Sequence, residues 1–358
     1  MAFGLNNRTT KKRTGQIVGI DLGGRTTKAV LIQSKGEGYS FLNYTIQDAP
    51  IYEKNITADL LGEHLKSVLN KLSCKTRKVN LTISGNDSIV RVVDLPQMAV
   101  SDMRLMLKHG SKTYLQQDLP DYVFDCYVIP SQFVPLKQVE SEKKASAQKL
   151  RVVVGGAKRS FVDEFQAGAK IAGITIENLV PEIICPINAF EYAQPEIFQN
   201  SVVALVDIGF KNCSISILVK GELVLNRMVN MGGDKLTSSL AESMGITYAE
   251  AESIKIGMPE EVSSNLEQFV IPLGRELRAS LDFCEHQFDV TVEHVFVSGG
   301  SARSEFILKC LQNELIAQCK LWNPTSFMEL RLPPQLIGEC EYVAPQLAVA
   351  VGAAVCSF

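Results

Sequence analysis

The chain has 358 residues, of which 46% are hydrophobic and 21% are charged, and its formal net charge at pH 7 is −3. These values exclude a disordered or fibrous chain, and they predict two domains, or one deeply cleft unit, with a large core. Because so small a charge leaves no broad basic field, we expect no nucleic-acid partner.

Nine cysteines occur without a CxxC pair, and the first residues carry no apolar signal core. Both features predict a cytoplasmic protein with reduced thiols. The apolar run at 347–356 is much shorter than the roughly 20 residues that cross a bilayer, so we expect no membrane-spanning helix. The polar, basic residues 1–15 predict a flexible tail. An alternative is a weak attraction of Lys11, Lys12 and Arg13 to anionic lipid.

The first predicted strand ends in an acid. Residues 17–20 are apolar, Asp21 follows, and Leu-Gly-Gly at 22–24 leads toward a second strand at 29–33. A strand, a glycine turn and a strand form a hairpin, whose amides and Thr hydroxyls can bind phosphate oxygens. A purely structural hairpin explains the same residues.

A helical apolar stripe at 58–72 is expected to pack on the sheet. A strand follows at 79–84, and Asn86 and Asp87 precede the next one. These two polar residues could be read as the base loop of a kinase, but Gly-Asn-Asp is ordinary turn chemistry and favours a turn. Residues 16–88 are predicted to form the first part of domain I.

Residues 89–175 are predicted to form an inserted α+β subdomain. It starts with a strand at 89–93 and continues with an amphipathic helix at 103–117, with Ser101 or Asp102 as the N-cap, and a strand at 122–129.

A polar segment at 131–149 then separates this strand from a further strand that begins at 150. The length of the segment is typical of a disordered or partner-facing loop. A helix at 160–171 is expected to end at Gly173.

The chain returns to domain I over residues 176–200. A strand at 174–180 precedes Glu182, which lies at the predicted start of a helix. A carboxylate at that position can simply complement the helix dipole.

Domain II is predicted over residues 201–344, and it begins as domain I does. The apolar run 202–206 ends in Asp207, Ile208 and Gly209, and strands at 214–220 and 223–228 follow. Two buried strands that each end in Asp and Gly are expected to present carboxylates and close-approaching loops to one site.

Further along, Gly232, Gly233 and Asp234 precede a helix at 235–244. Residues 247–250 are expected to cap another helix, in which Glu252 and Lys255 lie on adjacent turns. The alternative for this pair is a modest surface ion pair.

A long helix is predicted at 273–288, after Pro272. Its Cys284 and His286 point to different faces, so we reject a metal site there. A short strand at 294–298 then runs into Gly-Gly-Ser at 299–301, which opens a helix at 304–316.

The last predicted element is a C-terminal helix at 345–355, within the segment 345–358.

Taken in this order, the two strand–Asp–Gly hairpins, the Gly-Gly-Asp turn, the Glu-x-x-Lys helix and the Ser-Gly-Gly strand end resemble the actin-like ATPase superfamily, which includes actin, Hsp70 chaperones, FtsA and sugar kinases. The resemblance implies an α/β fold of duplicated actin-like (ribonuclease H-like) domains around a nucleotide cleft. It also implies ATP or ADP with Mg²⁺, held by two carboxylates that leave most of its shell to water and phosphate.

The resemblance assigns candidate site residues. The first phosphate loop is Asp21, Gly23, Gly24, Arg25, Thr26, Thr27 and Lys28, and the second is Asp207, Gly209, Lys211 and Asn212. The other nucleotide contacts are Gly232, Gly233, Asp234, Glu252, Lys255, Gly299, Gly300 and Ser301. Asp21 and Asp207 are the Mg²⁺ candidates, and Glu182 is the candidate catalytic residue, which positions the attacking water.

Within this superfamily the chain resembles the PilM family of type IV pilus assembly, with the cytoplasmic part of GspL of type II secretion behind it. The resemblance lies in Leu-Pro-Gln-Met at 95–98, Gly-Gly-Asp with Leu236 and Thr237, and Ala-Glu-Ala-Glu-Ser-Ile-Lys at 249–255. It implies that residues 89–175 are the 1C subdomain shared by PilM and FtsA. It also implies that the cleft beside this subdomain binds the cytoplasmic N-terminal tail of a PilN-like inner-membrane protein.

Two departures from the family pattern concern catalysis. Gly24, Arg25 and Thr26 stand where PilM-like loops carry serines. In the second loop, residues 210–213 read Phe-Lys-Asn-Cys in place of a small residue and a hydroxyl. We therefore expect ATP binding with weak or absent hydrolysis.

Two functions remain open at this point. The first is a nucleotide-responsive scaffold of pilus assembly or secretion, peripheral at the inner membrane through its partner, with other pilus proteins or a second copy as possible further partners. The second is a ROK-like sugar kinase, because residues 21–28 also resemble the first loop of those kinases. An FtsA-like cell-division protein is a further alternative.

Overall fold

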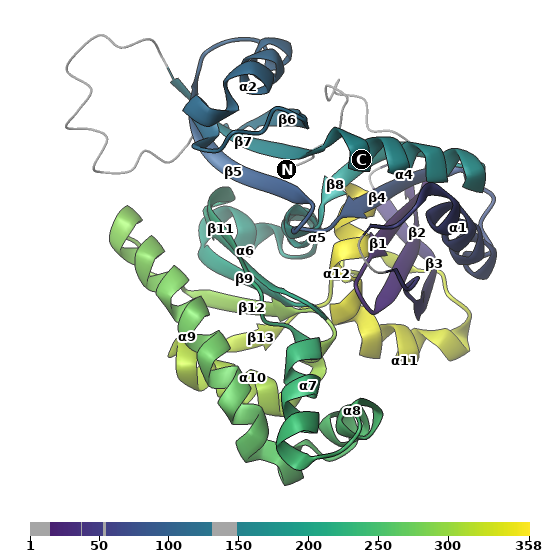
Figure 1. The fold of residues 1–358 in the computed structure, drawn as a ribbon, viewed down its shortest axis with the longest axis vertical. Coiled ribbons are helices and arrows are strands. Elements are labelled where there is room, and N and C mark those ends of the chain that lie inside the picture. The colour runs from purple at the N-terminus through teal and green to yellow at the C-terminus, as the bar shows by residue number, and fades with distance from the viewer. Residues whose placement is uncertain (1–14, 37, 53–54, 131–148) are drawn as a thin grey trace. The chain divides into compact units, whose positions relative to one another are not determined.

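The computed structural model of the chain describes residues 15–36, 38–52, 55–130 and 149–358 (Figure 1). The predicted tail and the predicted polar loop therefore lie outside the described residues, apart from Gly15 and Lys149. The chain divides into two compact units. The first comprises Met1–Ala193, Pro324–Glu341 and Leu347–Phe358, and the second comprises Gln194–Asn323 and Tyr342–Gln346.

The first unit is built on a six-stranded sheet in the order β14-β3-β2-β1-β4-β8. Its strands are β1 (Gly15–Leu22), β2 (Thr26–Lys35), β3 (Gly38–Asp48), β4 (Lys78–Ile83), β8 (Thr175–Pro181) and β14 (Glu329–Leu330). The first three strands are antiparallel neighbours, while β4 runs parallel to β1 and β8 runs parallel to β4. The predicted hairpin at Asp21 is confirmed.

Helices α1 (Ala58–Leu72) and α4 (Arg159–Ala172) cover one face of this sheet. The apolar stripe of α1 packs with Val18 and Ile20 of β1 and with Phe165 of α4 in one core cluster. Helix α4 ends where the sequence predicted, because Gly173 adopts a left-handed φ of 66°.

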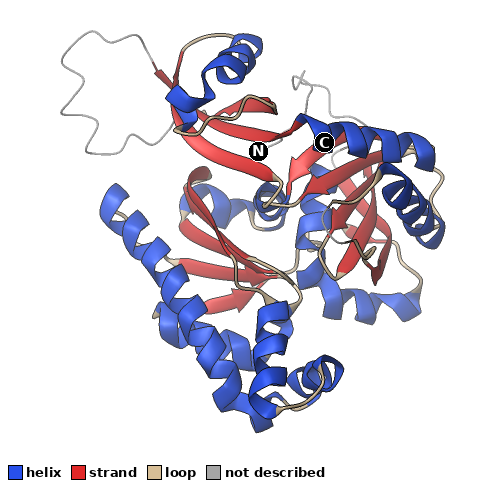
Figure 2. Cartoon of the chain, viewed as in Figure 1, coloured by secondary structure: helices blue, strands red, loops and turns tan. Residues whose placement is uncertain are grey.

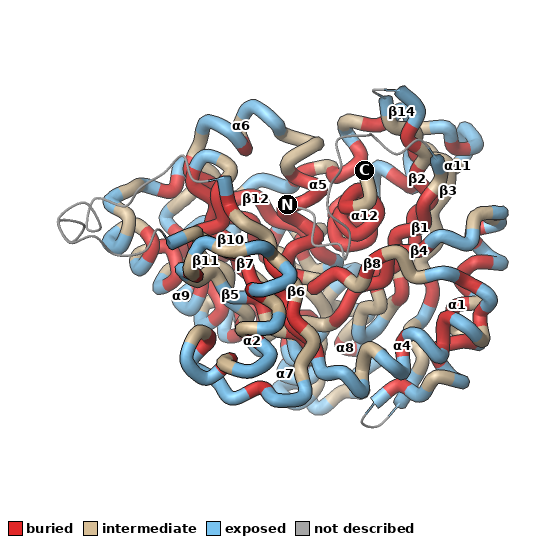
Figure 3. Tube along the Cα trace, turned by 90° about the horizontal axis from the view of Figure 1, so that it is seen from above, coloured by how far each residue is buried: buried red, intermediate tan, exposed pale blue. Residues whose placement is uncertain are grey.

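Helix α12 (Ala348–Val355) packs on β1 from the other side of the sheet. Its residues are all buried, as Figure 3 shows, and it lies against α5 (Cys185–Ala193). A Cβ at Gly19 would clash with the Ala350 carbonyl oxygen, so small residues on both elements permit this contact. The C-terminal helix was expected from residue 345, but a 3-10 helix (Ala344–Leu347) precedes it.

A separate three-stranded sheet, in the order β5-β7-β6, lies within the first unit (Figure 2). It consists of β5 (Ser88–Pro96), β6 (Tyr122–Val128) and β7 (Lys149–Lys158), and α2 (Val100–Leu115) packs on one face. The predicted N-cap of α2 was wrong. The cap is Ala99, and Asp102 lies in the first turn, where its charge complements the helix dipole.

The second unit repeats the strand arrangement of the first, in the order β11-β10-β9-β12-β13. Its strands are β9 (Val202–Ile208), β10 (Cys213–Val219), β11 (Glu222–Val229), β12 (His294–Ser298) and β13 (Cys319–Leu321). Strands β9, β10 and β11 are antiparallel neighbours, while β12 runs parallel to β9 and β13 runs parallel to β12. The duplication expected from the order of motifs is therefore present in the topology.

The helices of the second unit are α6 (Pro195–Asn200), α7 (Gly233–Met244), α8 (Tyr248–Gly257), α9 (Ser263–Phe288) and α10 (Glu305–Leu315). The start predicted for α9 was wrong, since the helix begins at Ser263 and contains Pro272. Leu266, Phe269 and Val270 lie on its buried face before the proline. Their packing outweighs the one backbone hydrogen bond that proline removes.

The remaining helix, α11 (Pro334–Val343), precedes the 3-10 turn before α12. Among the described helices, none is both long enough and apolar enough to cross a bilayer.

Candidate functional site

In the first unit, β1 presents Asp21 beside the turn that leads into β2. Asp21 is 5% exposed, and Lys28 Nζ lies 3.0 Å from its Oδ2 across the hairpin. The neighbouring strand β4 contributes Thr82, whose Oγ1 accepts a hydrogen bond from the Leu22 amide at 3.1 Å. The carboxylate is therefore fixed at the carboxyl end of a strand, which is where open α/β sheets bind ligands.

The turn between β1 and β2 leaves little space for side chains. A Cβ at Gly23 would lie 2.7 Å from the Thr26 carbonyl oxygen and 2.8 Å from Lys28 Nζ. Gly24 and Arg25 are exposed at the tip. Glycine at position 23 is therefore required by the packing of the turn itself, while the exposed Gly24 leaves the backbone at the tip accessible to a ligand.

Thr27 lies on the opposite face of the hairpin from Asp21, since neighbouring residues of a strand alternate between faces. Its side chain is fully buried, and its Oγ1 lies 2.8 Å from Nε2 of His64 on α1. Burial, with a smaller effect of Lys71, lowers the pKa of His64 and favours the neutral ring. The hydroxyl of Thr27 is used inside the first unit, so a phosphate contact by this residue would come from its backbone.

Glu182 begins the 3-10 helix (Glu182–Ile184) that leads into α5. Its Oε1 accepts a hydrogen bond from the Gly85 amide at 2.8 Å, which holds the turn between β4 and β5. The Asp87 amide donates to the Ser84 carbonyl at 3.0 Å and closes this turn. The turn predicted around Asp87 is therefore confirmed, and Glu182 has a structural contact in addition to the catalytic role expected for it.

In the second unit, Asp207 occupies the carboxyl end of β9, as Asp21 does on β1. Parallel pairing of β9 with β12 places Ser298 beside it, and Ser298 Oγ donates to Asp207 Oδ1 at 2.7 Å. Burial and, less strongly, the charge of Asp207 raise the pKa of Cys213 at the start of β10. Cys213 is therefore a neutral, buried thiol near this carboxylate.

The turn after β9 packs on the start of α7. The Gly233 amide donates to the Gly209 carbonyl at 3.0 Å, and the Asp234 amide donates to the Phe210 carbonyl at 2.8 Å. A Cβ at Gly232 would clash with that same carbonyl oxygen of Phe210. The Gly-Gly-Asp motif thus lets two turns approach each other at the distance of backbone hydrogen bonds.

The turn after β9 carries three side chains that are larger than the small residue and the hydroxyl of the family pattern. Phe210 and Asn212 are half-buried, and Lys211 is exposed. The Gly209 amide donates to the Asn212 carbonyl at 2.9 Å, which closes the turn. The Lys211 ammonium can offset the charge of a phosphate held at this turn.

The turn after β12 joins this group. Gly299 has a φ of 96°, and a Cβ there would clash with the Ile208 carbonyl oxygen. Gly300 follows, and Ser301 begins a 3-10 helix (Ser301–Arg303). The Ser301 Oγ would lie 2.7 Å from a Cβ at Gly233. Three glycine-containing turns of the second unit therefore meet beside Asp207.

Glu252 and Lys255 are more buried than a surface ion pair. Their side chains are 13% and 11% exposed, and Lys255 Nζ lies 2.6 Å from Glu252 Oε2. Thr237 of α7 links them, because its Oγ1 lies 2.7 Å from Lys255 Nζ and 2.5 Å from Glu252 Oε2. The same oxygen lies 2.9 Å from the Gly233 carbonyl, which connects the pair to the Gly-Gly-Asp turn.

Asp234 accepts a hydrogen bond from the hydroxyl of Tyr248, the first residue of α8, at 2.9 Å. Burial, together with this hydrogen bond, raises the pKa of Tyr248 to about 12. The phenol therefore stays protonated and acts as a donor at neutral pH. Helix α8 is thus tied to the start of α7 at two points, by Tyr248 and by Thr237.

The second unit brings together all the candidates assigned to it, namely Asp207, Gly209, Lys211, Asn212, Gly232, Gly233, Asp234, Glu252, Lys255, Gly299, Gly300 and Ser301. The first unit brings together those of its hairpin and places Glu182 on another element. Each unit, taken by itself, offers an acid at the carboxyl end of a strand and a lysine ammonium, Lys28 in the first and Lys255 in the second, and such groups bind Mg²⁺ and phosphates.

The donor chemistry fits Mg²⁺ bound through water. The described residues include no group of three or more His, Cys, Asp or Glu side chains that could enclose a metal ion. Mg²⁺ retains several waters and is commonly bound by one or two carboxylates together with substrate phosphates. Asp21 and Asp207 are suited to that role as single carboxylates.

Three residues that organise these turns, Thr237, Tyr248 and Ser298, occur in the sequence motifs but were not predicted as site residues. Thr237 lies four residues after Gly233 on the same helix, so the helical period, together with its place in the Gly-Gly-Asp motif, could have indicated its contact with that turn. The contact of Ser298 with Asp207 spans 91 residues and depends on strand register.

A small apolar groove lies in the first unit beside the three-stranded sheet. It has a volume of about 80 Å³, and its walls include Ile83, Val123, Phe124, Val162 and Leu179. Strand β6 contributes Val123 and lies at the edge of its sheet. An edge strand next to an apolar groove can accept an extended segment of another chain.

Comparison with known proteins agrees with this architecture. A family model described as type IV pilus assembly protein PilM matches residues 19–358. The structure of a PilM–PilN type IV pilus biogenesis complex matches with a TM-score of 0.81 at 19% identity, over 96% of this chain and 99% of that chain.

Two further similarities are weaker. A ROK family glucokinase from Streptomyces griseus, in complex with glucose and AMPPNP, matches with a TM-score of 0.50 at 14% identity, over 95% of this chain and 98% of that chain. The cell division protein FtsA of Bacillus subtilis (strain 168) is 27% identical over 133 residues, which are 36% of this chain and 29% of FtsA. The expected actin-like α/β fold is confirmed.

Proposed function

Because this chain belongs to the family of type IV pilus assembly proteins PilM, we propose that it is a nucleotide-binding scaffold of pilus assembly. In this proposal the chain binds the cytoplasmic N-terminal tail of a PilN-like inner-membrane protein, and ATP binding changes the affinity for that tail. The chain is then held at the inner membrane through its partner. The sugar-kinase and FtsA-like alternatives are not favoured by the family match.

The observation that supports nucleotide binding is the meeting of three glycine turns beside Asp207. The amides of Gly209, Gly233 and Gly299 donate to carbonyl oxygens of the second unit and hold these turns in place, and a Cβ at Gly209, Gly232 or Gly299 would clash with the neighbouring backbone. Glycine turns that are held in this way let a ligand approach the main chain closely. The buried Lys255 beside them adds a cation whose position is set by Thr237 and Glu252.

We assign Asp21 and Asp207 as the carboxylates that hold Mg²⁺ through water. Lys28, beside Asp21, is suited to contact a phosphate of the nucleotide when the carboxylate turns to the hydrated metal. Mg²⁺ would supply charge neutralisation for the phosphates. The residues named in the three turns bind and orient the nucleotide.

Slow hydrolysis is part of the proposal. The second phosphate turn carries Phe210, and the neighbouring Cys213 is buried, so neither supplies the hydroxyl found in related turns. Glu182 is the proposed water-positioning residue, and its hydrogen bond to Gly85 holds the carboxylate in place.

Isothermal calorimetry with Mg-ATP and with Mg-ADP tests the assignment on four proteins. The wild type is expected to bind, while Asp207→Asn and Asp21→Asn lose affinity because the charge that holds the hydrated ion is gone. Asn preserves side-chain shape, so folding is retained. Asp163→Asn, on the exposed surface of α4, is the matched control. Wild-type affinity in both site variants would reject the proposal.

The groove beside β6 is the proposed position of the partner tail. Its apolar walls suit alternate side chains of an extended peptide, and β6, which is an edge strand among the described strands of its sheet, suits the peptide backbone. Asp125 at this groove is already paired with Arg104 of α2, whose Nε lies 2.9 Å from Asp125 Oδ1. The groove therefore selects for apolar side chains more than for charge.

A further inference from the structure

The first sheet has one edge at which several elements begin or end. Strands β1, β4 and β8 run parallel, so all three start at this edge, and β2 ends there beside Gly15. Helices α1 and α4 precede β4 and β8 and therefore end at the same edge. The Thr175 amide donates to the Arg77 carbonyl at 2.8 Å, which joins the two strand starts. We call this the amino edge.

The amino edge is the opposite end of β1 from Asp21, and exposed cations gather on it. They come from the end of β2, the last turns of α1 and α4, and the segment that enters β4. They are Lys35, Lys71, Lys75, Arg77, Lys78 and Lys170, all of them exposed. Since the whole chain carries a net charge of −3, this concentration of positive charge is local.

Intramolecular contacts account for part of this cluster. Lys71 and Lys170 lie in the last turns of their helices, where a cation complements the helix dipole. Lys78 Nζ lies 3.9 Å from Glu177 Oε1. Among the described residues, neither of these explanations applies to Lys35, Lys75 and Arg77, whose exposed charges are suited to an external anion.

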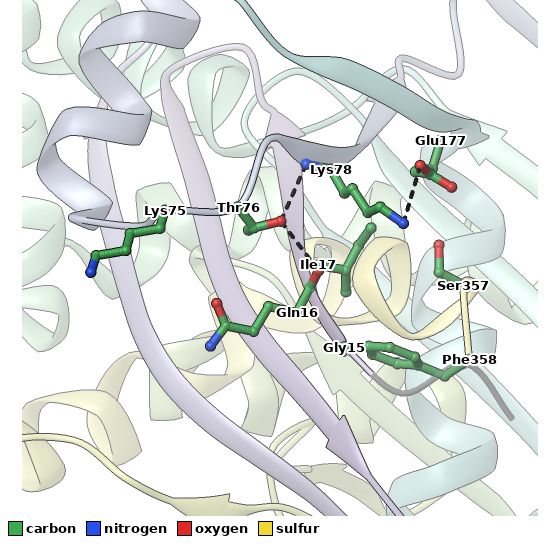
Figure 4. A pocket seen from close by; sticks show the side chains of 9 residues that line it. All are labelled: Gly15, Gln16, Ile17, Lys75, Thr76, Lys78, Glu177, Ser357 and Phe358. Carbon is green, nitrogen blue, oxygen red and sulfur yellow. Dashed lines mark hydrogen bonds and ion pairs between the residues drawn. The ribbon is translucent and has the colours of Figure 1, made fainter.

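A cavity of about 440 Å³ opens in the middle of the amino edge. Ile17 and Phe358 give it an apolar lining, and Lys75 and Lys78 lie on its rim. Figure 4 shows Lys78 directed toward Glu177 and Lys75 extended away from the other lining side chains. Thr76 fixes this rim, because its hydroxyl donates to the Gln16 carbonyl at 3.3 Å and accepts from the Lys78 amide.

We propose that the amino edge contacts an anionic lipid surface directly. The cations come from four different segments along the edge, and two of them, Lys75 and Lys78, line the cavity. Cations spread over an edge in this way match a sheet of mobile anionic headgroups better than a single acidic peptide. The apolar lining beneath a cationic rim suits the junction of headgroup and acyl chain.

The proposal is independent of nucleotide and peptide binding, and purified protein with vesicles is enough to test it. Flotation with phosphatidylglycerol-containing vesicles is compared with pure phosphatidylcholine vesicles at low and high salt. Each basic residue near such a surface contributes about a fivefold change in partitioning. The triple variant K35Q/K75Q/R77Q is therefore expected to bind on the order of a hundredfold more weakly.

Two further variants separate charge from folding. K108Q/K112Q/K309Q removes three exposed lysines on α2 and α10 and is expected to bind as wild type does. K35R/K75R/R77K retains the charges and is also expected to bind as wild type does. Lys78 is left unchanged in every variant, so Glu177 keeps its cation.

The proposal is supported if vesicle binding requires phosphatidylglycerol and is lost at high salt, and if K35Q/K75Q/R77Q is the one variant of the three that loses it. It is overturned if wild-type protein does not float with phosphatidylglycerol vesicles, or if it floats equally well with pure phosphatidylcholine. It is also overturned if the control triple loses as much binding as K35Q/K75Q/R77Q. Binding to a DNA duplex but not to vesicles would show a nucleic-acid surface instead and would reject the lipid assignment.

Discussion

At the scale of single residues, Thr237 shows how one hydroxyl can connect elements that carry separate parts of a site. Its Oγ1 lies within hydrogen-bond distance of Lys255, Glu252 and the Gly233 carbonyl. A hydroxyl donates one hydrogen and accepts from other donors, so it accepts from the ammonium and donates to either oxygen. It thereby holds the buried ion pair against the Gly-Gly-Asp turn.

We predict that Thr237→Val weakens Mg-ATP binding on the order of tenfold, because Lys255 loses the partner that orients it and a buried polar group is left short of a bond. Calorimetry measures the affinity. Thr237→Ser keeps the hydroxyl and should bind nearly as well as wild type. If the valine and serine variants bind alike, the hydroxyl has no positioning role.

A second prediction concerns Gly232, whose Cβ would clash with the Phe210 carbonyl oxygen. Gly232→Ala must separate the two turns, and overpacking of this kind costs about 1–3 kcal/mol of the free energy of unfolding. Chemical denaturation measures that loss. Gly257→Ala is the matched control, since a Cβ there would meet nothing within 4 Å. Equal stability of the two variants would contradict the backbone contact between the turns.

At the scale of elements, the start of α8 has both halves of a capping box. The Thr247 side chain accepts from the Glu250 amide, and the Glu250 carboxylate accepts from the Thr247 amide at 2.8 Å. The cap expected at residues 247–250 is therefore confirmed. Because Tyr248 and Lys255 lie on this helix, the box also fixes the direction from which they reach α7.

The capping box gives a prediction for pH dependence. Hydrogen bonds from Thr247 lower the pKa of Glu250 below its ordinary value of 4.5. A group with a lowered pKa in the folded state adds stability above its unfolded pKa, and this stability is lost as pH falls through the folded pKa. The melting temperature of Glu250→Gln should therefore be lower than that of the wild type at neutral pH. In acid, the two melting temperatures should be the same.

Thermal unfolding followed by circular dichroism across this pH range measures the difference. In a Thr247→Ala background, one hydrogen bond to Glu250 is missing, so the effect of the glutamine substitution should shrink. A melting difference that stays constant from neutral to acid pH would argue against the cap as its source.

At the scale of the whole molecule, two units with the same strand arrangement each present an acid at the carboxyl end of the first strand of their sheet. The first unit also contains the groove beside β6 and the amino edge, at separate places on its surface. Under the proposed function, nucleotide binding and partner binding are distinct events on one chain. Thermodynamic linkage then requires that each ligand change the affinity of the other by the same factor.

We predict this reciprocity for AMPPNP and a peptide with the sequence of the partner's N-terminal tail. Calorimetry of each ligand, with and without the other, should give the same ratio of dissociation constants. Val123→Arg places a charge in the groove and should abolish peptide binding while AMPPNP binding is kept. Leu105→Arg, on the exposed side of α2, is the control. Peptide binding by Val123→Arg at wild-type affinity would place the tail elsewhere.

The sequence by itself determined the two acid-ended hairpins, the helical stripe of α1, the glycine turns and the cap of α8. These features follow from neighbours within a few residues, where period, turn chemistry and capping act locally. Pro272 misled the prediction of α9 for the same reason, since a local rule cannot weigh the buried face that continues through the proline.

Only the tertiary structure decided which distant groups meet. The contact of Ser298 with Asp207 depends on the register of β12 beside β9, and Thr237 reaches Lys255 only once α7 and α8 are packed. The cations of the amino edge come from segments as far apart as Lys35 and Lys170, and the direction of the strands brings them to one edge. Parallel and antiparallel pairing sets these positions, and pairing depends on packing across the whole sheet and not on any short stretch of residues.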